Sequence, residues 1–461
     1  MAQHLNYIAG DWVEGKATIN DANPSDLSDI VGQYAAADAA QTSGAVAAAK
    51  AALPKWAATT PQARADILDA IGSEILSRKE ELGRLLSREE GKPLADGIGE
   101  LARAGQIFKF YAGEALRIEG VNLASVRAGV DVTVTREPLG VVGLITPWNF
   151  PAAIPAWKLA PALAFGNTVV FKPAELVPAT AWAIVDIAAR SGLPKGVLNL
   201  VMGKGSIVGE ALINNKDVAA VSFTGSTTVG ARVAQACVGR GAKFQLEMGG
   251  KNPLIVLDDA DLALAVGAAI NGAFYQTGQR CTASSRLIAT KKIHDQFVDR
   301  MIGAMKELKV DNALEPGTQV GPVVDERQLE QDMKYLDIGR KEGAELAWGG
   351  ERLNRATNGY YLQPALFVKT DNHMQINRDE IFGPIASVIK VDDYDQALAV
   401  ADDTALGLSS AIFTSSLKHA SHFRKHTEAG MVMVNLPTAG VDYHVPFGGS
   451  KGSSYGPREQ G

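Results

Sequence analysis

The sequence predicts an α/β protein with two doubly wound parallel sheets in tandem, and three observations lead to this fold class. Short β-branched runs alternate with amphipathic segments from residue 140 onward, which is the pattern of βαβ units. The alternation starts again at PLIVL, residues 253–257. A chain of 461 residues also exceeds what one hydrophobic core usually supports, so more than one domain is expected.

The first series begins with a strand at VVGLI, residues 141–145, and a proline-punctuated helix. In chain order there follow the strand TVVFKP, a helix over 179–191, the strand VLNLVMG, a helix over 206–214 and the strand AVSFTGS. Parallel sheets of this kind bind ligands beyond the carboxyl ends of their strands. Functional residues are therefore expected directly after these strands.

The second series follows a joint near Met248-Gly249-Gly250. After PLIVL we expect a helix over 262–276, the strand RLIAT, a long helix over 292–308, and strands at SSAIF and MVMVN. Ahead of both series, residues 35–58 and 61–89 are predicted to form helices packed on the first unit. VTVTREP alternates in the manner of an exposed strand.

Composition excludes several function classes. The 45 Lys and Arg against 51 Asp and Glu leave a net charge of -6, and no basic run with interleaved aromatics suggests nucleic-acid binding. The start of the chain lacks the order of a signal peptide, and the longest apolar stretch, 152–171, is broken by prolines and Lys158. We therefore expect a cytoplasmic protein without a membrane span. Two cysteines without metal-ligand spacing predict neither a disulfide framework nor a metal site.

Cys281 is the first candidate for chemistry. It lies in FYQTGQRCTASSRLIA, in a predicted turn between a helix and a strand, where catalytic groups concentrate. A cysteine hydrolase needs an activating histidine, and none is near in sequence, although a distant one could approach in space. The alternative is a small buried hydrophobe, which is also how we interpret Cys237.

A dinucleotide site is the second candidate, although the usual G-x-G-x-x-G is absent. Gly225 and Ser226 close a strand and open a helix whose amides could hold a pyrophosphate, or Ser226 could be an ordinary N-cap. In FKPAE, Lys172 ends a strand and Glu175 could accept both hydroxyls of an adenine ribose, which favours NAD. Lys172 could instead pair with a phosphate, so NADP stays possible.

Five motifs then occur in order along the whole chain: TPWNFP, LEMGGKNP, GQRC, EIFGP and PFGGSKGS. Together they resemble the NAD(P)-dependent aldehyde dehydrogenase superfamily. The resemblance implies an aldehyde dehydrogenase-like fold, in which a small β hairpin joins copies into a homodimer or homotetramer. It assigns 1–117 to the cofactor-binding domain, 118–139 to the oligomerisation hairpin, 140–247 to the Rossmann-like core and 248–430 to the catalytic domain. Residues 431–461 are expected to return to the cofactor domain and the interface, and they end before the strand with which family members usually finish.

The resemblance also implies site roles. Cys281 is the expected nucleophile, its backbone N–H and the Asn149 amide hold the oxyanion, and Glu247 is the general base for thioester hydrolysis. Lys158, counted with the catalytic residues, and Glu380 are expected to hold the cofactor's ribose. The remaining cofactor groove is expected from Phe382 beside the nicotinamide and from Trp148, Lys172, Glu175, Gly225 and Ser226. Outside these motifs, Asn149 would pass as an Asx turn and Phe382 as a core residue.

Within the superfamily, the Cys281 segment and the tail GVDYHVPFGGSKGSSYGPREQG resemble dehydrogenases of 2-oxoglutarate semialdehyde. A substrate with a carboxylate favours an arginine in its tunnel, and Arg103 and Arg280 are the candidates, with surface arginine as the alternative for both. Apolar walls are expected from Phe150, Trp157, Tyr275 and Phe447. Succinate or glutarate semialdehyde would satisfy the same chemistry. Glu247 disfavours a CoA-acylating enzyme, and the complete set of Asn149, Glu247 and Cys281 disfavours a catalytically idle relative.

Overall fold

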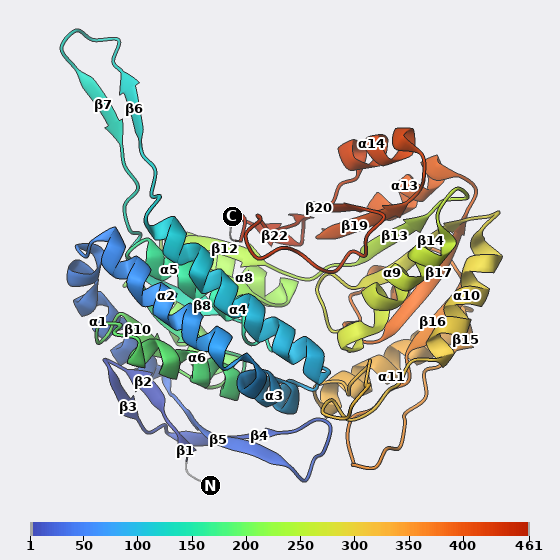
Figure 1. Cartoon of the computed structure of the whole chain (residues 1–461), viewed down its shortest axis with the longest axis horizontal. Coiled ribbons are helices and arrows are strands. Elements are labelled where there is room, and N and C mark those ends of the chain that lie inside the picture. Colours follow the sequence, from blue (N-terminus) through green and yellow to red (C-terminus); the bar gives the residue numbers. More distant parts are fainter. Residues whose placement is uncertain (1–2, 460–461) are drawn as a thin grey trace.

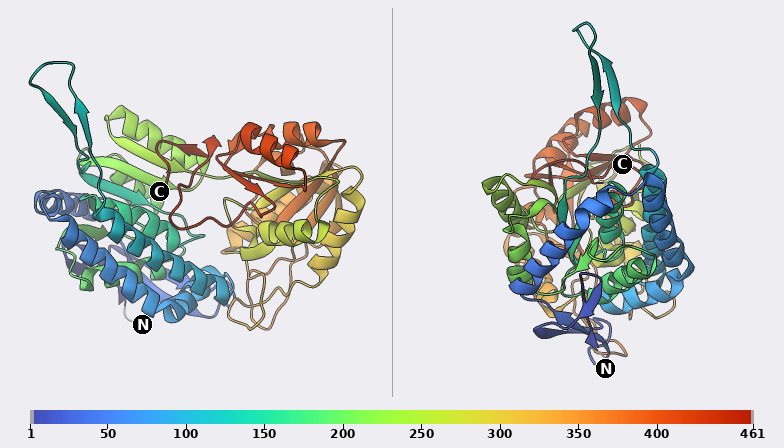
Figure 2. Two further views of the ribbon diagram at one scale, coloured as in Figure 1. Left: turned by 45° about the horizontal axis from the view of Figure 1, so that its top comes forward. Right: turned by 90° about the vertical axis from the view of Figure 1, so that its left-hand side faces the viewer.

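The structure is a computed structural model that describes residues 3–459 as two α/β lobes, with one hairpin projecting from the first (Figure 1). The first lobe contains most of the chain up to Glu247, and the second contains most of the residues after it. Views from two further sides show the last segment of the chain running back from the second lobe to the first (Figure 2). A cofactor or substrate held between the lobes can therefore contact segments that are far apart in sequence.

The central sheet of the first lobe confirms the α/β prediction. Its core strands β8 to β12 pair in parallel, while β2, β3 and β22 add antiparallel edges. Within residues 3–459 the strand order is β22 (Ser454–Tyr455), β12 (Lys243–Glu247), β11 (Val218–Thr224), β8 (Val141–Ile145), β9 (Thr168–Lys172), β10 (Leu198–Leu200), β2 (Asn6–Ile8) and β3 (Asp11–Val13). The helices around it are α1 (Ala39–Ala57), α5 (Ala153–Ala164), α6 (Pro178–Arg190), α7 (Glu210–Ile213) and α8 (Thr227–Gly239).

The second lobe has its own parallel sheet, with the antiparallel strand β15 at one edge. Within the described residues its order is β15 (Glu345–Trp348), β16 (Ala365–Thr370), β17 (Ile385–Val391), β14 (Ser284–Thr290), β13 (Asn252–Val256), β19 (Ser409–Phe413) and β20 (Met431–Val434). Its helices are α9 (Leu262–Phe274), α10 (His294–Lys306), α11 (Glu326–Lys341), α12 (Gln375–Arg378), α13 (Tyr394–Asp402) and α14 (Leu417–His426). Because β20 pairs with β19 in this sheet, the chain returns to the first lobe after Val434 and not from residue 431.

The N-terminal third differs most from expectation. Residue 35 lies in β5 (Ile30–Ala36), and α1 starts only after Asp38, whose side chain accepts the N–H of Gln41 in a capping box. The helix expected over 61–89 is two helices, α2 (Pro61–Ser77) and α3 (Lys79–Glu90), followed by α4 (Leu94–Ala115). The helix expected over 206–214 is a π turn (Gly205–Gly209) that continues into α7. A sheet of β1 (Gln3–His4), β5 and β4 (Ala17–Ala22) was not predicted.

The hairpin consists of β6 (Val121–Ala124) and β7 (Asp131–Val134), and it projects away from the first lobe (Figure 1). It presents apolar side chains to solvent, among them Leu123, which is 54% exposed. Its place matches the segment 118–139 that we expect to join copies of the chain. That assembly role remains a prediction. A second short pair, β18 (Leu406–Gly407) and β21 (Ser450–Lys451), anchors the returning segment.

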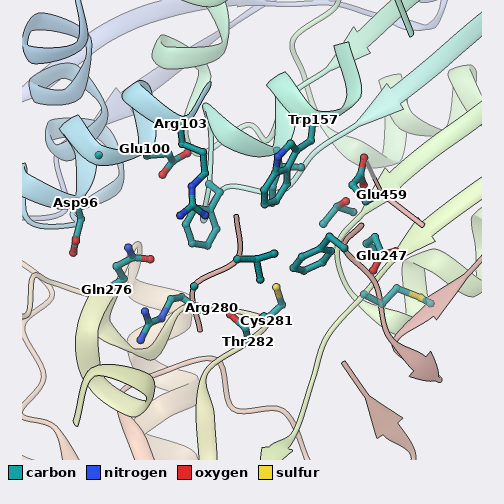
Figure 3. Close-up of a pocket in the computed structure, with 18 of the residues that line it drawn as sticks. Asp96, Glu100, Arg103, Trp157, Glu247, Gln276, Arg280, Cys281, Thr282 and Glu459 are labelled. Atoms are coloured by element: carbon teal, nitrogen blue, oxygen red, sulfur yellow. The ribbon is translucent and has the colours of Figure 1, made fainter. Parts of the chain in front are cut away.

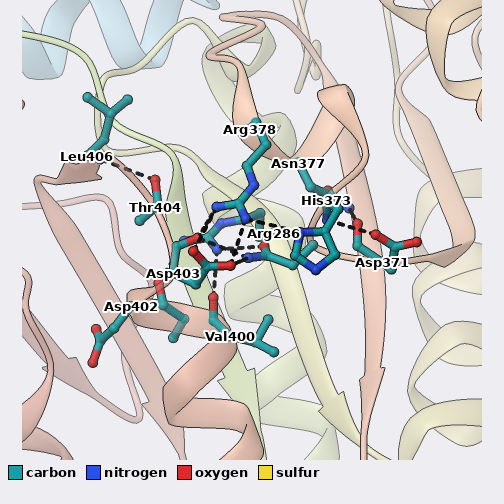
Figure 4. A network of polar contacts seen from close by, with 12 residues as sticks. Arg286, Asp371, His373, Asn377, Arg378, Val400, Asp402, Asp403, Thr404 and Leu406 are labelled. Atoms are coloured by element: carbon teal, nitrogen blue, oxygen red, sulfur yellow. Dashed lines mark hydrogen bonds and ion pairs between the residues drawn. The ribbon is translucent and has the colours of Figure 1, made fainter.

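A buried arginine organises the second lobe. Arg286 of β14 donates to the carbonyls of Lys251, Val400 and Ala401, so it ties the joint between the lobes to the end of α13. Figure 4 shows this arginine beside Arg378, whose guanidinium pairs with Asp403 at 2.7 Å. The network holds the segment from α12 to the start of β17, which includes EIFGP.

Within residues 3–459, no helix combines the length and apolar character needed to cross a lipid bilayer. The same residues contain no group of three or more His, Cys, Asp or Glu side chains placed to hold a metal ion.

Candidate active site

A cavity of about 250 Å³ opens beside the sulfur of Cys281, and its lining comes from both lobes (Figure 3). Helices α4 and α5 supply one side, the end of β12 another, and the turn before β14 the floor. The returning segment closes it with Val441 and Phe447. Of the residues singled out from the sequence, the lining includes Arg103, Phe150, Trp157, Glu247, Arg280, Cys281 and Phe447.

The turn that carries Cys281 depends on close backbone packing. Gly278 has φ of +65°, and a Cβ there would come within 2.3 Å of the carbonyl oxygen of Gly383. The carbonyl of Cys281 accepts a 2.7 Å hydrogen bond from Asn252 Nδ2, which fixes the turn against the second sheet. Burial raises the pKa of the Cys281 thiol to about 12, with smaller contributions from the charges of Glu380 and Glu247. The thiol is therefore protonated in this arrangement and needs a base.

Asn149 reaches the same turn from the first lobe. Its Nδ2 donates a 3.0 Å hydrogen bond to the carbonyl of Gln279, two residues before Cys281. A side-chain amide carries two hydrogens, so this bond uses only one of them. The Asn149 carbonyl in turn accepts a 2.7 Å hydrogen bond from the buried ammonium of Lys92. The residue is thus held at its side chain and at its backbone.

Glu247 ends β12 and is 2% exposed. Burial, with a smaller contribution from the charge of Glu459, raises the pKa of this carboxyl to about 8. A hydrogen bond from Ser454 opposes this shift by stabilising the carboxylate. A carboxyl that titrates near neutrality can both accept and release a proton, which is what a general base requires.

The predicted substrate residues divide into two groups. Arg103 points from α4 into the cavity, and burial lowers the pKa of its guanidinium (Figure 3). Arg280 lines the same cavity, but its guanidinium extends away from Cys281 and donates to the carbonyls of Asn271 and Gly272 at the end of α9. The second candidate is thus occupied with capping a helix, contrary to the role predicted for it.

The predicted apolar walls are only partly present. Trp157 and Phe447 lie with ring centroids 5.6 Å apart, and Phe150 lies beneath the Lys92 ammonium at 4.2 Å. Tyr275 was expected here as well, and this expectation is wrong. Its ring packs against the core of the second lobe, and its hydroxyl accepts a 3.3 Å hydrogen bond from Gln319.

A second set of predicted residues converges where the lobes join. Glu380 Oε1 accepts the N–H of Gly250 at 2.9 Å, and burial raises the pKa of this carboxyl to about 7. A Cβ on Gly249 would lie 1.9 Å from Glu380 Oε2, so any larger residue there would displace this carboxylate. Phe382 adopts φ of 63° and meets Trp148 edge-on, with centroids 5.4 Å apart. Two residues from different lobes thus form one aromatic wall.

The remaining groove residues lie at the carboxyl ends of β9 and β11. Lys172 ends β9 as predicted, and burial lowers the pKa of its ammonium to about 8, opposed by the charge of Glu175. Glu175 is exposed three residues later. Ser226 caps α8, since its Oγ accepts the N–H of Val229 at 3.4 Å, and Gly225 precedes it. The N-cap interpretation of Ser226 therefore applies, and it leaves the other amides of that helix end available.

Comparison with known proteins settles the family. The model of the aldehyde dehydrogenase family matches residues 12–461. The chain belongs to this family, whose members are oxidoreductases that act on aldehydes. It is 44% identical to an alpha-ketoglutaric semialdehyde dehydrogenase of Bacillus subtilis over 462 aligned residues, which cover 99% of this chain and 95% of that one. An alpha-ketoglutarate semialdehyde dehydrogenase of Haloferax volcanii is 42% identical, with the same two coverages.

Solved aldehyde dehydrogenases share the fold. A betaine aldehyde dehydrogenase point mutant of Staphylococcus aureus in complex with NAD+ superimposes with a TM-score of 0.97 at 32% identity. The superposition covers 99% of this chain and 93% of that one. The arrangement of two lobes around the cavity is therefore that of an aldehyde dehydrogenase.

The contacts of Lys158 do not support the ribose contact expected of it. Its ammonium lies 2.6 Å from Glu459, 2.7 Å from Ser222 Oγ and 3.3 Å from Gln245 Oε1. Three acceptors take up its three donor hydrogens, so none remains for a ribose. The ion pair between Lys158 and Glu459 is buried. Gln245 connects it to Glu247, because Gln245 Oε1 accepts from Lys158 and Gln245 Nε2 donates to Glu247 Oε1 at 3.4 Å.

Several cavity residues were not predicted. Asp96 and Glu100 of α4 line it beside Arg103, and Thr282 and Glu459 complete it near Cys281 and Glu247 (Figure 3). Glu100 is a charged residue on the buried face of α4, and its partner Lys92 precedes that helix, so no pattern within the helix marks Glu100 as part of a site. Glu459 lies near the end of the chain and pairs with a lysine 301 positions away, a relationship that no local pattern contains.

Proposed function

We propose that this protein oxidises 2-oxoglutarate semialdehyde to 2-oxoglutarate, with NAD as the hydride acceptor. The observation that carries the proposal is Arg103, a cation inside the cavity that leads to Cys281. A guanidinium binds a carboxylate in bidentate fashion, and partial burial strengthens the contact. The names of the Bacillus subtilis and Haloferax volcanii relatives support the same substrate.

Charge in the cavity argues against a cationic substrate. Betaine aldehyde, which the Staphylococcus aureus relative is named for, carries a permanent positive charge that Arg103 would repel. The acidic residues nearby do not reverse this. Of the carboxylates whose charge acts on Arg103, Glu100 and Asp442, the first is already paired with Lys92 at 2.6 Å. Burial raises the pKa of Asp96, which lines the same cavity.

The joint between the lobes fits a nicotinamide dinucleotide. Glu380 and Glu175 offer carboxylate acceptors for ribose hydroxyls, and the start of α8 offers amides for the pyrophosphate. Phe382 and Trp148 offer an aromatic wall beside the Cys281 turn. Glu175 favours NAD, because the 2'-phosphate of NADP would meet its negative charge. Lys172 could offset that charge, and NADP is the second candidate.

Acylation of Cys281 is the first half of the proposed reaction. The thiol passes its proton to the Glu247 carboxylate, and the sulfur bonds to the aldehyde carbon. The carbonyl electrons move to oxygen, where the backbone N–H of Cys281 and the second Nδ2 hydrogen of Asn149 stabilise the oxyanion. NAD, when bound, accepts the hydride that this adduct releases. A thioester on Cys281 remains.

Hydrolysis of the thioester is the second half. The proton that Glu247 took from the thiol is first released to solvent, which restores the carboxylate. Glu247 then takes a proton from water, and the hydroxide adds to the thioester carbon at the same oxyanion site. The carbon–sulfur bond breaks, the sulfur takes the proton back from Glu247 to regenerate the thiol, and the carboxylic acid leaves. With a pKa of about 8, Glu247 is suited to exchange protons near neutral pH.

The Arg103→Leu variant tests the substrate. We expect kcat/KM for 2-oxoglutarate semialdehyde to fall by roughly 10- to 100-fold, the range for losing hydrogen bonds to a charged group. For butanal, which has no carboxylate, kcat/KM should fall by less than about threefold. Lys109→Leu is the matched control, because Lys109 is an exposed cation on the same helix and pairs with Asp69 outside the cavity lining.

Equal losses with both aldehydes would remove Arg103 from substrate recognition. The same assay with succinic and glutaric semialdehydes, and with NAD and NADP, separates the remaining alternatives. A carboxylate-dependent preference for succinic semialdehyde, which is one carbon shorter, or for glutaric semialdehyde, which lacks the 2-oxo group, would replace 2-oxoglutarate semialdehyde as the substrate.

A further inference from the structure

A buried ion pair lies behind the Asn149 loop. Lys92 follows Gly91, the left-handed residue that ends α3, and Glu100 lies about one and a half turns into α4. Their charged atoms are 2.6 Å apart, with side-chain exposures of 1% and 3%. Removing two charges from water is costly unless they make further contacts, so their other hydrogen bonds show what the pair holds.

Apart from a 3.9 Å ion pair between Lys92 and the buried Glu90, the further side-chain contacts of this pair go to one loop. Lys92 Nζ donates to the Asn149 carbonyl at 2.7 Å. Glu100 Oε1 accepts the N–H groups of Ala152 at 2.8 Å and Ala153 at 3.0 Å. The two ends of a five-residue segment, Asn149 to Ala153, are thus attached to the two members of one ion pair. Phe150, between those ends, lies against the Lys92 ammonium.

Helix α5 explains why the glutamate is needed. It begins at Ala153 after Ala152, and no side chain of its own caps its first amides. The first amides of a helix lack partners inside the helix and carry its positive dipole end. Glu100 supplies the missing acceptor from α4, and Lys92 balances its charge. The position of the Asn149 loop therefore depends on a cap from another element.

We propose that Lys92 and Glu100 act as positioning residues for the reaction, by holding the Asn149 amide in the oxyanion site. The inference rests on the role of Asn149 under Proposed function. Asn149 has a second anchor through Nδ2 at Gln279, but that bond fixes the tip of the side chain and not the backbone that carries it. Without the pair, the loop loses a donor and an acceptor at once, and the amide no longer has one position relative to Cys281.

A double-mutant cycle tests this. Lys92→Met and Asn149→Ala are measured alone and together for kcat and KM with butanal, which keeps the carboxylate question apart. We expect Lys92→Met to lower kcat on the order of 10²-fold, the scale for a misplaced catalytic group, with little change in KM. In the Asn149→Ala background the same change should lower kcat less than about threefold, because the group through which it acts is gone.

Companion variants separate positioning from loss of fold. Glu100→Gln keeps an oxygen for the two amides and should retain more activity than Glu100→Ala. Arg88→Met is the matched control, since it breaks a partly buried ion pair with Asp29 at the end of the same helix α3, away from the loop. Its kcat should match the unmodified enzyme. Circular dichroism and the thermal midpoint confirm that each variant is folded.

The outcomes distinguish the positioning role of Lys92 and Glu100 from the oxyanion role of Asn149. If Asn149→Ala keeps its kcat, the oxyanion role of Asn149 fails. If Asn149→Ala is impaired but Lys92→Met costs the same factor in both backgrounds, the oxyanion role stands and the positioning role of Lys92 and Glu100 is refuted. A Lys92→Met variant with unchanged kcat would refute it as well.

Discussion

Ser454 Oγ donates a 2.5 Å hydrogen bond to Oε2 of Glu247. Ser454 lies in β22, the strand by which the end of the chain returns to the first sheet, and it pairs in register with Glu247 on β12. Because this bond stabilises the carboxylate, it holds the pKa of Glu247 below the value that burial alone would produce. The returning segment thus tunes the proposed general base.

Ser454→Ala should raise the pKa of Glu247 above about 8. The ionised form is the active one, so the acidic limb of the kcat profile should move to higher pH. Activity near neutrality should fall, and activity well above the new pKa should be retained. The measurement is kcat over neutral to alkaline pH, with Ser415→Ala as control, which removes a hydroxyl from Asp259 in the second lobe. A limb that stays or moves to lower pH contradicts this.

Glu247→Gln removes the base that both halves of the proposed reaction use. Glutamine cannot accept a proton from water, so thioester hydrolysis should slow by roughly 10²- to 10⁴-fold. If the thiol still reacts, stopped-flow absorbance should show a burst of NADH close to one equivalent per site, followed by slow turnover. Cys237→Ala, which removes the other cysteine, should behave as the unmodified enzyme. Unchanged steady turnover in Glu247→Gln would exclude Glu247 as the base.

Glu380→Gln should make Cys281 more reactive toward alkylation. The negative charge of Glu380 contributes, after burial, to raising the thiol pKa to about 12. Removing that charge lowers the pKa and increases the thiolate fraction at any given alkaline pH. The rate of iodoacetamide labelling, followed by mass spectrometry of the Cys281 peptide, measures this. The exposed change Glu428→Gln should leave the rate unaltered, and a slower rate in Glu380→Gln would contradict the electrostatic argument.

Periodicity and turn chemistry were sufficient for much of the fold. The strands around VVGLI and RLIAT and the joint near Gly249 follow from alternation and glycine placement alone. The N-terminal strands did not, because segments of two or three residues such as β1 and β2 carry no measurable period. The break at Arg78 between α2 and α3 also leaves the helical pattern nearly continuous.

The residues of the site also divide into those that a local sequence pattern identifies and those that only the fold brings together. Cys281, Asn149 and Glu247 each lie within a short contiguous motif, so the sequence alone is enough to single them out. The structure brings the three segments to one cavity. Tyr275 was misplaced, and the direction of the Arg280 guanidinium was not foreseen, because the direction of a side chain in a turn depends on backbone angles such as the positive φ of Gln276 and Thr277. Lys158 and Glu459 depend on a pairing across the whole chain, so only three-dimensional proximity reveals it.

Arg286→Met should destabilise the second lobe. Methionine has similar bulk but cannot donate, so the carbonyls of Lys251, Val400 and Ala401 would be buried without partners. At about 1–3 kcal/mol for each unsatisfied group, and with some relief from rearrangement, we expect a loss of roughly 3 kcal/mol.

For domains of this size such a loss corresponds to a thermal midpoint lower by roughly 5–10 °C. Arg378→Met is the control in the same network, because that guanidinium is partly exposed and its pair with Asp403 contributes little. Differential scanning calorimetry with NAD absent and present separates the two lobes if they unfold in steps. A midpoint within a degree or so of the unmodified protein, for a folded Arg286→Met, would mean that the buried arginine is offset by its own desolvation and does not stabilise the lobe.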